Sequence, residues 1–217
     1  MRSKFDKDLA MLNHELIEMG ALCERIIAVV TKALTDGDEQ ATKNALPIDD
    51  KIDEMEHVIE KRCLKLLLSQ QPVARDLRQI SSALKMITDM ERIGDQAYDI
   101  AEIISFMKGR SGGECAYIKQ MGKTVIKMVS ESIDAYVKQD ESIANEVIKT
   151  DDVVDDYFDK TKKDLISIIS SNPADGEYAI DLLMIAKYFE RIGDHATNIA
   201  EWVVFSITGF HKGVEEI

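Results

Sequence analysis

A thirteen-residue segment of the chain recurs almost unchanged ninety-nine residues further on. MERIGDQAYDIAE begins at Met90 and FERIGDHATNIAE begins at Phe189, with nine of the thirteen positions identical. A second echo, DDKIDEM from Asp49 and DDVVDDY from Asp151, has an offset of 102 residues. Self-similarity at a long, nearly fixed period indicates that one structural unit occurs twice. The chain is therefore expected to fold as two similar halves.

The boundary between the halves is predicted at MKGRSGGEC, residues 107–115. This stretch is basic, contains glycine and serine, and shows no apolar periodicity, which is typical of a linker. We therefore predict one domain over residues 1–107 and a second over residues 115–217. The two offsets differ by three residues, and the turns SQQPVARD and SNPADG are where such a difference is most easily accommodated.

Helical periodicity dominates each half, and no long stretch alternates with period two, so we expect no sheet. Only 3 of 217 residues are proline, which permits long helices. Pro47 marks a kink or a helix start. Long helices with short connections favour antiparallel neighbours. The predicted fold is all-α, with two pseudo-symmetric antiparallel three-helix bundles, and one continuous six-helix bundle is the alternative. The expected helices span residues 5–35, 38–69, 73–107, 116–138, 140–170 and 174–208.

Charge and cysteine content narrow the classes of function. The net charge of −13 repels phosphate backbones, so we expect no nucleic-acid partner, whereas cations or basic protein surfaces would be attracted. No run of about 18 apolar residues occurs, so direct membrane insertion is not expected. The opening MRSKFDKDLA lacks a signal-peptide pattern. Cys23, Cys63 and Cys115 are scattered and read as reduced thiols. A cytoplasmic protein is predicted.

Acidic residues form stripes beside the apolar stripes of four predicted helices. In the segment that contains the first ERIGD copy, the apolar stripe includes Ala83, Met86, Met90, Ile93, Ala97, Ile100 and Ile104. Carboxylates at spacing i, i+4 lie on its flank, and both repeats carry them on two helices each. Whether the two acidic stripes of one half share a groove or turn away from each other stays open. The pairs are Asp49 with Asp53, Glu91 with Asp95, Asp151 with Asp155, and Glu190 with Asp194.

Like charges at this spacing repel each other, and clustering raises the pKa of some carboxyl groups. A bound cation would remove this penalty, because carboxylates are ligands for hard and borderline metal ions. The eight paired carboxylates are therefore candidate ligands for a divalent or trivalent metal ion: Mn, Mg, Fe or Zn. A solvated helix face of an acidic protein is the alternative.

Three further features of the repeated motif have two interpretations each. Gly94 and Gly193 indicate either close approach of a neighbouring helix or an opened surface beside the carboxylates. Arg92 and Arg191 indicate either salt bridges to adjacent acids or contacts to an anion or partner. His195, which adjoins Asp194, indicates either a surface or satisfied histidine or a further metal ligand. No P-loop, G-x-S-x-G, H-E-x-x-H or Ser/His/Asp pattern occurs, so an enzyme is not predicted.

Three features of the sequence resemble the PhoU family, and together they extend over essentially the whole chain. They are the doubled motif within ARDLRQISSALKMITDMERIGDQAYDIAE and YFERIGDHATNIAE, the paired DDKID and DDVVD, and the opening FDKDLAMLNHELIEMGALCERII. The resemblance implies a non-enzymatic adaptor that restrains phosphate-starvation signalling and phosphate uptake. Its implied partners are the ATPase subunit of the phosphate ABC transporter and a sensor histidine kinase, and a homodimer is expected. It also implies metal binding at the E/D-x-x-x-D motifs, with Asp99 as an additional acid. Asn198 replaces this acid in the second repeat.

Two rival functions remain beside the adaptor. One is a metal-storage or metal-dependent protein built on carboxylate helices, and the other is a purely structural helical dimer. Di-iron bundles use inward-facing Glu and E-x-x-H motifs. Here the acids lie off the apolar stripe and no E-x-x-H occurs, which argues against the first rival.

Overall fold

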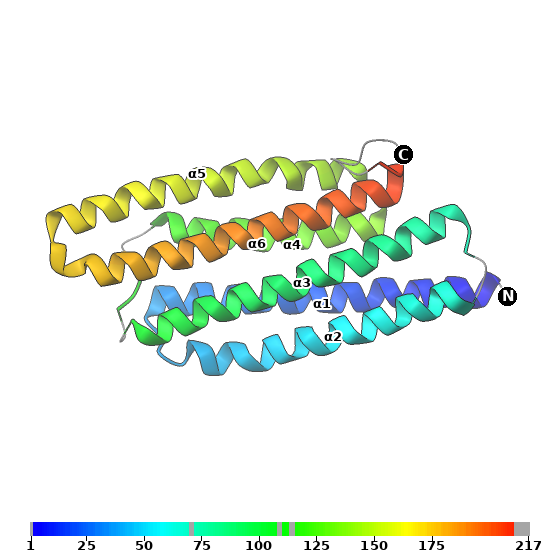
Figure 1. The fold of residues 1–217 in the computed structure, drawn as a ribbon, viewed down its shortest axis with the longest axis horizontal. Coiled ribbons are helices and arrows are strands. Elements are labelled where there is room, and N and C mark those ends of the chain that lie inside the picture. Colours follow the sequence, from blue (N-terminus) through cyan, green and yellow to red (C-terminus); the bar gives the residue numbers. More distant parts are fainter. Residues whose placement is uncertain (1, 70–71, 108–109, 113–115, 211–217) are drawn as a thin grey trace.

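The computed structural model describes residues 2–69, 72–107, 110–112 and 116–210, and within these ranges the chain is helical with no strand. The all-α prediction is therefore confirmed. Six long helices run antiparallel in an elongated molecule, in which α1 begins and α6 ends at the same end (Figure 1). They are α1 (Arg2–Asp36), α2 (Ala41–Ser69), α3 (Ala74–Phe106), α4 (Ala116–Lys138), α5 (Glu141–Ser171) and α6 (Gly176–Thr208), with a short 3-10 helix η1 (Pro173–Asp175) before α6.

Local sequence explains where the helices begin and end. The Asp140 side chain caps α5 by accepting hydrogen bonds from the backbone nitrogens of Ser142 (2.9 Å) and Ile143 (3.2 Å). α6 ends at Gly209, whose φ of 84° is a left-handed conformation that favours glycine. Pro47 lies inside α2, which begins at Ala41, so the interpretation of Pro47 as a helix start is wrong.

The packing of the helices joins the two halves closely. Within each half the three helices contact one another, and between halves α1 packs on α4 and α3 packs on α6. α2 and α5 therefore flank a central group of four helices (Figure 1). One hydrophobic core runs through both halves. The division into domains at residues 107 and 115 stays a prediction, because this continuous core does not itself mark a boundary.

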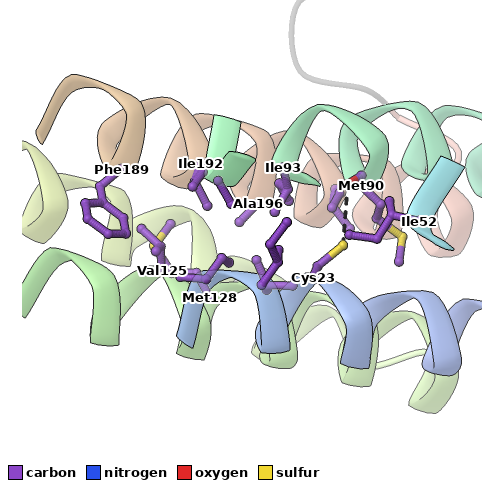
Figure 2. Close-up of a cluster of buried hydrophobic side chains, with 14 of the residues drawn as sticks. Cys23, Ile52, Met90, Ile93, Val125, Met128, Phe189, Ile192 and Ala196 are labelled. Atoms are coloured by element: carbon purple, nitrogen blue, oxygen red, sulfur yellow. Dashed lines mark hydrogen bonds between the residues drawn. The ribbon is translucent and has the colours of Figure 1, made fainter. Parts of the chain in front are cut away.

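Residues far apart in sequence meet in this core. Figure 2 shows Cys23, Met90 and Ile93 of the first half in one cluster of buried side chains with Met128 and Ala196 of the second. The Cys23 thiol donates a hydrogen bond to the Met90 carbonyl over 3.4 Å. The predicted apolar stripe of α3 is confirmed, since all seven of its residues are buried. Cys23 and Cys63 are buried free thiols, and Cys115 lies outside the described residues.

The contacts between the halves follow an internal pseudo-two-fold symmetry. Gly20 and Gly122 are 102 residues apart, as are Thr31 and Ile133. A Cβ at Gly20 would lie 3.0 Å from Ile133 Cγ1, and a Cβ at Gly122 would lie 2.4 Å from Thr31 Oγ1. Equivalent pairs therefore make close approaches between α1 and α4. The absence of a side chain at each glycine leaves room for the side chain of the facing helix, Ile133 or Thr31.

The connection between the halves is described only in part. Residues 108–109 and 113–115 of the predicted linker lie outside the described ranges. Between them, the Gly112 backbone nitrogen donates to the Leu34 carbonyl over 2.8 Å. Arg110 forms an ion pair with Asp175 over 3.0 Å and lies 3.8 Å from the Tyr178 ring centroid. The connection is thereby anchored to both halves.

Candidate functional site

The acidic stripes of α2 and α3 meet where the two helices pack together. Asp49 and Asp53 of α2 face Glu91 and Asp95 of α3, and we call these four residues the first carboxylate patch. Burial raises the pKa of Asp49 from an ordinary 3.8 to about 7, and repulsion from Asp53, Asp95 and Glu91 adds to this effect. Burial and repulsion from Asp95 also raise the pKa of Glu91. The question that the sequence left open is answered, because the two stripes meet.

The first motif glycine is explained by its contact with this patch. A Cβ at Gly94 would lie 2.8 Å from Asp49 Oδ1 and 3.1 Å from Ile52 Cδ1. The absence of a side chain therefore lets α2 approach α3 and gives the Asp49 carboxylate its place. The interpretation of Gly94 as a close approach of a neighbouring helix is therefore confirmed, whereas Gly94 is buried and does not open a surface beside the carboxylates.

The second half repeats this arrangement between α5 and α6. Asp151 and Asp155 of α5 face Glu190 and Asp194 of α6, and these four residues form the second carboxylate patch. Burial raises the pKa of Asp151 to about 6, with added repulsion from Asp194 and Asp155. A Cβ at Gly193 would lie 3.3 Å from Asp151 Oδ1, which is a looser contact than at Gly94. The motif glycine thus meets the same acid in both halves.

Each patch contains a basic side chain, but at different positions of the repeat. In the first patch the Arg92 guanidinium lies 2.9 Å from Asp95 Oδ2 and 3.4 Å from Glu91 Oε2, as the salt-bridge interpretation of Arg92 predicts. In the second patch Lys187 pairs with Glu190. Arg191, the counterpart of Arg92, lies 5.8 Å from the Tyr188 ring instead. The two patches are therefore electrostatically different.

Asp99 lies beside the first carboxylate patch, on the seam between α3 and α6, where Asp95 adds to the repulsion on it. Burial raises its pKa, and a hydrogen bond with the Tyr188 hydroxyl opposes that shift. The internal symmetry relates this contact of Asp99 with Tyr188 to a contact of Asn198 with Asp89. The Asn198 amide donates a hydrogen bond to Asp89 Oδ1 over 3.2 Å. His195 Nδ1 lies 2.9 Å from the same oxygen. Asp99 and His195 thus contact the opposite repeat, and the role of Asp99 in metal binding stays a prediction.

Comparison with known proteins agrees with this doubled arrangement. The PhoU domain family matches residues 16–104 and residues 118–203, so one copy covers each half. The chain belongs to the PhoU family. Each of the two carboxylate patches lies within one PhoU domain.

Relatives and solved structures match nearly the full length. A PhoU homologue of Clostridium acetobutylicum, named a phosphate-specific transport system accessory protein, is 38% identical over 96% of both chains. A homologue of the same name from Pseudomonas aeruginosa is 33% identical and covers 95% of this chain and 86% of its own length. The crystal structure of PhoU from Pseudomonas aeruginosa superposes with a TM-score of 0.89 over 95% of this chain and 100% of that one. PhoU from Streptococcus pneumoniae gives a TM-score of 0.86 at 25% identity, over 97% of this chain and 100% of that one.

The side chains of the two carboxylate patches are of the right chemical type to bind a metal ion, but they are not arranged around a common point. The donors are carboxylates, which hard cations prefer. Asp49 Oδ1 is buried and accepts no hydrogen bond in the described structure, so it lacks compensation for its burial. Across the described ranges, however, no three His, Cys, Asp or Glu side chains converge closely enough to hold a metal ion. A cation would therefore require carboxylate rotamers to change.

Sequence reasoning missed Lys187 and the seam residues Asp89 and Tyr188. Asp89 and Tyr188 occupy equivalent positions of the two repeats, 99 residues apart. The two residues differ in type, and a search for equivalent positions that differ between the repeats would have singled them out. Lys187 aligns with Thr88 at that offset, and the repeat gives no signal for it. Its pairing with Glu190 depends on the i, i+3 spacing alone.

Replacement of Asp49 by Asn is expected to remove a pH dependence of stability. The pKa of Asp49 is raised in the folded protein, so its contribution to stability is complete below about 3.8 and is lost as pH rises through about 7. Because Asp49 is half-buried and solvent screens its charge, we expect a loss of about 1–2 kcal/mol in wild-type unfolding free energy across this range. D49N should lose less. Urea unfolding in chelator-treated buffer at several pH values measures both proteins.

Asp164→Asn is the matched control, since Asp164 is exposed on α5 outside both patches. Its stability should fall with pH as steeply as that of the wild type. A D49N profile parallel to that of the wild type would contradict the assignment of this pH dependence to the first carboxylate patch.

Proposed function

We propose that this protein is a cytoplasmic, non-enzymatic adaptor that restrains phosphate-starvation signalling and phosphate uptake when phosphate is plentiful. The observation that carries the proposal is the match of both PhoU domains to relatives named phosphate-specific transport system accessory proteins, over 96% of the chain in the first case. Its proposed partners are the ATPase subunit of the phosphate transporter and the sensor histidine kinase, and it acts as a homodimer. None of the helices in the described ranges contains a stretch apolar enough to span a bilayer.

An adaptor requires a rigid body and surfaces whose affinity for partners depends on state. The continuous core through all six helices supports the first requirement. The two carboxylate patches support the second, because a bound cation would neutralise much of the negative charge that a partner meets. In this proposal Asp49, Asp53, Glu91 and Asp95 hold a metal ion on one half, and Asp151, Asp155, Glu190 and Asp194 hold one on the other. The ion supplies charge and no reaction step.

Metal storage is the second candidate function, and the buried, unpaired Asp49 oxygen is the observation in its favour. Storage requires many ions per chain, whereas regulation requires one or a few at each patch. Equilibrium dialysis of the chelator-treated protein with Mn²⁺ or Fe²⁺, followed by elemental analysis, separates the two. A stoichiometry that continues to rise well beyond a few ions per chain would favour storage.

Deletion of the gene is expected to leave phosphate-starvation genes switched on in high phosphate, because the restraining contact is lost. Reporter expression from a phosphate-starvation promoter measures this in low and high phosphate. A plasmid copy of the wild-type gene should restore repression and provides the control. Normal shut-off in the deletion strain at high phosphate would refute the adaptor proposal.

A further inference from the structure

A groove on the face opposite the α3–α6 seam is lined by α1 and α4. Its volume is about 310 Å³, and Ala28, Lys32 and Asp36 of α1 line it together with Lys119 and Ile126 of α4. The close contact of Gly122 with Thr31 holds the two helices together at this position. The groove thus combines an apolar part with two cationic side chains.

The lysines of this groove outnumber its one acid, Asp36. Lys32, Lys119 and the adjacent Lys123 are exposed, and none of them forms an ion pair with another described residue, although Asp36 lies in the same groove. The first fifteen residues of α4, 116–130, contain three lysines and neither Asp nor Glu. In a protein of net charge −13 this is a locally positive surface.

The internal symmetry shows that the positive groove occurs once. At the offset of 102 residues, Lys32 corresponds to Asp134 and Lys119 corresponds to Ile17. Asp134 pairs with Lys138 over 2.6 Å, so the related position is neutral. The helices on this face are therefore related by the internal symmetry, but their charges are not. Of the two symmetry-related positions, only the one with Lys32 and Lys119 is positively charged, so a partner would bind at that position.

We propose that the α1–α4 groove binds an acidic amphipathic segment of a partner protein. Carboxylates of the segment pair with Lys32, Lys119 and Lys123, and its apolar side chains contact Ala28 and Ile126. This inference rests on the proposed adaptor function, because it gives the chemistry of one partner contact. Attraction between the groove and the segment would steer the encounter and would weaken with salt.

The lining of the groove favours a protein segment over other anions. A free phosphate ion is small and polar and would make no apolar contact with Ala28 and Ile126. Nucleic acid is opposed by the acidic remainder of the surface. A second copy could offer its carboxylate patches, but such a contact joins two different surfaces of the chain and forms a ring or an open filament, according to the rotation between copies. A partner with a short acidic helix meets none of these objections.

The test uses the full-length protein and a fluorescein-labelled, 16-residue helical peptide with Glu on one face and Leu on the other. Fluorescence anisotropy measures its dissociation constant at low and high NaCl. K32E/K119E should bind about tenfold or more weakly, and K32Q/K119Q should lie between this variant and the wild type. K138E/K149E carries the same charge change at lysines already paired with Asp134 and Glu146, and should bind like the wild type. Circular dichroism confirms that all variants are folded.

Each outcome decides the inference. Absent binding to the wild type, or equal binding by K32E/K119E and the wild type, overturns it. Displacement of the peptide by millimolar inorganic phosphate assigns the groove to a free anion, and self-association lost in K32E/K119E by sedimentation assigns it to a second copy. Both results also overturn the proposal. The peptide titration does not depend on the deletion phenotype, so failure of the adaptor function and failure of this groove are distinguishable.

Discussion

In chelator-treated protein, saturating Mn²⁺ is expected to raise the unfolding free energy of the wild type and to raise that of E190Q/D194N much less. A ligand that binds only the folded state adds RT ln(1 + [L]/Kd), which is about 2.7 kcal/mol at a hundredfold excess over Kd. Glu190 and Asp194 supply half of the second carboxylate patch, and repulsion from Glu190 is among the causes that raise the pKa of Asp194. Gln and Asn keep the shape of these side chains and remove the charge that a cation would neutralise.

The matched control is Glu177→Gln/Asp181→Asn, which removes two carboxylates at the same i, i+4 spacing near the start of the same helix, outside both patches. This control should gain as much stability from Mn²⁺ as the wild type. Without metal, E190Q/D194N should be neutral or slightly stabilised, because lost repulsion offsets the lost pairing of Glu190 with Lys187. Thermal melting across a metal titration measures all three proteins. Equal shifts in all of them, or no shift in any, would return these residues to a solvated helix face.

Substitution of Gly122 by Ala is expected to destabilise the protein by about 1–3 kcal/mol, which is the usual cost of overpacking a close contact. The new Cβ would lie 2.4 Å from Thr31 Oγ1 and 2.9 Å from Thr31 Cγ2. Thr31 cannot avoid it by rotation, since its side chain branches at Cβ and its hydroxyl donates to the Ile27 carbonyl. α1 and α4 would have to separate. The gain of about 1 kcal/mol in helix propensity does not compensate fully.

Urea unfolding measures this effect, and two companion variants test its cause. Gly176→Ala adds the same methyl group where no atom lies within 4 Å, so it should be neutral or stabilising. Thr31→Ala removes both atoms of the clash and should recover part of the stability lost in Gly122→Ala. If Gly122→Ala is as stable as the wild type, or if Thr31→Ala gives no recovery, the close approach of α1 and α4 does not require glycine.

The internal repeat and the apolar periodicity were sufficient to predict the helices. Four of the six predicted starts lie within two residues of the observed ones, because Gly, Pro and capping residues punctuate the pattern locally. The starts of α1 and α2 each differ by three residues, and α2 accommodates Pro47 in its interior. The apolar stripe of α3 was also predicted correctly, as it follows from helix geometry alone. Phe158 of α5 is only half-buried, because α5 lies at the flank of the molecule.

What the sequence determined by itself is therefore local and periodic: helix type, helix extent, the face of each helix that is apolar, and the doubling of the unit. The tertiary structure decided everything that depends on how one helix is rotated and placed against another. Asp49 lies close to Asp95 where α2 packs on α3, while Asp99, four residues beyond Asp95, contacts Tyr188 of the other half. Two side chains one helical turn apart therefore have neighbours on different helices, and only the packing of the helices determines which neighbours these are. The charge of the α1–α4 groove is of the same kind, because Lys32 and Lys119 belong to different halves and meet only when those halves pack.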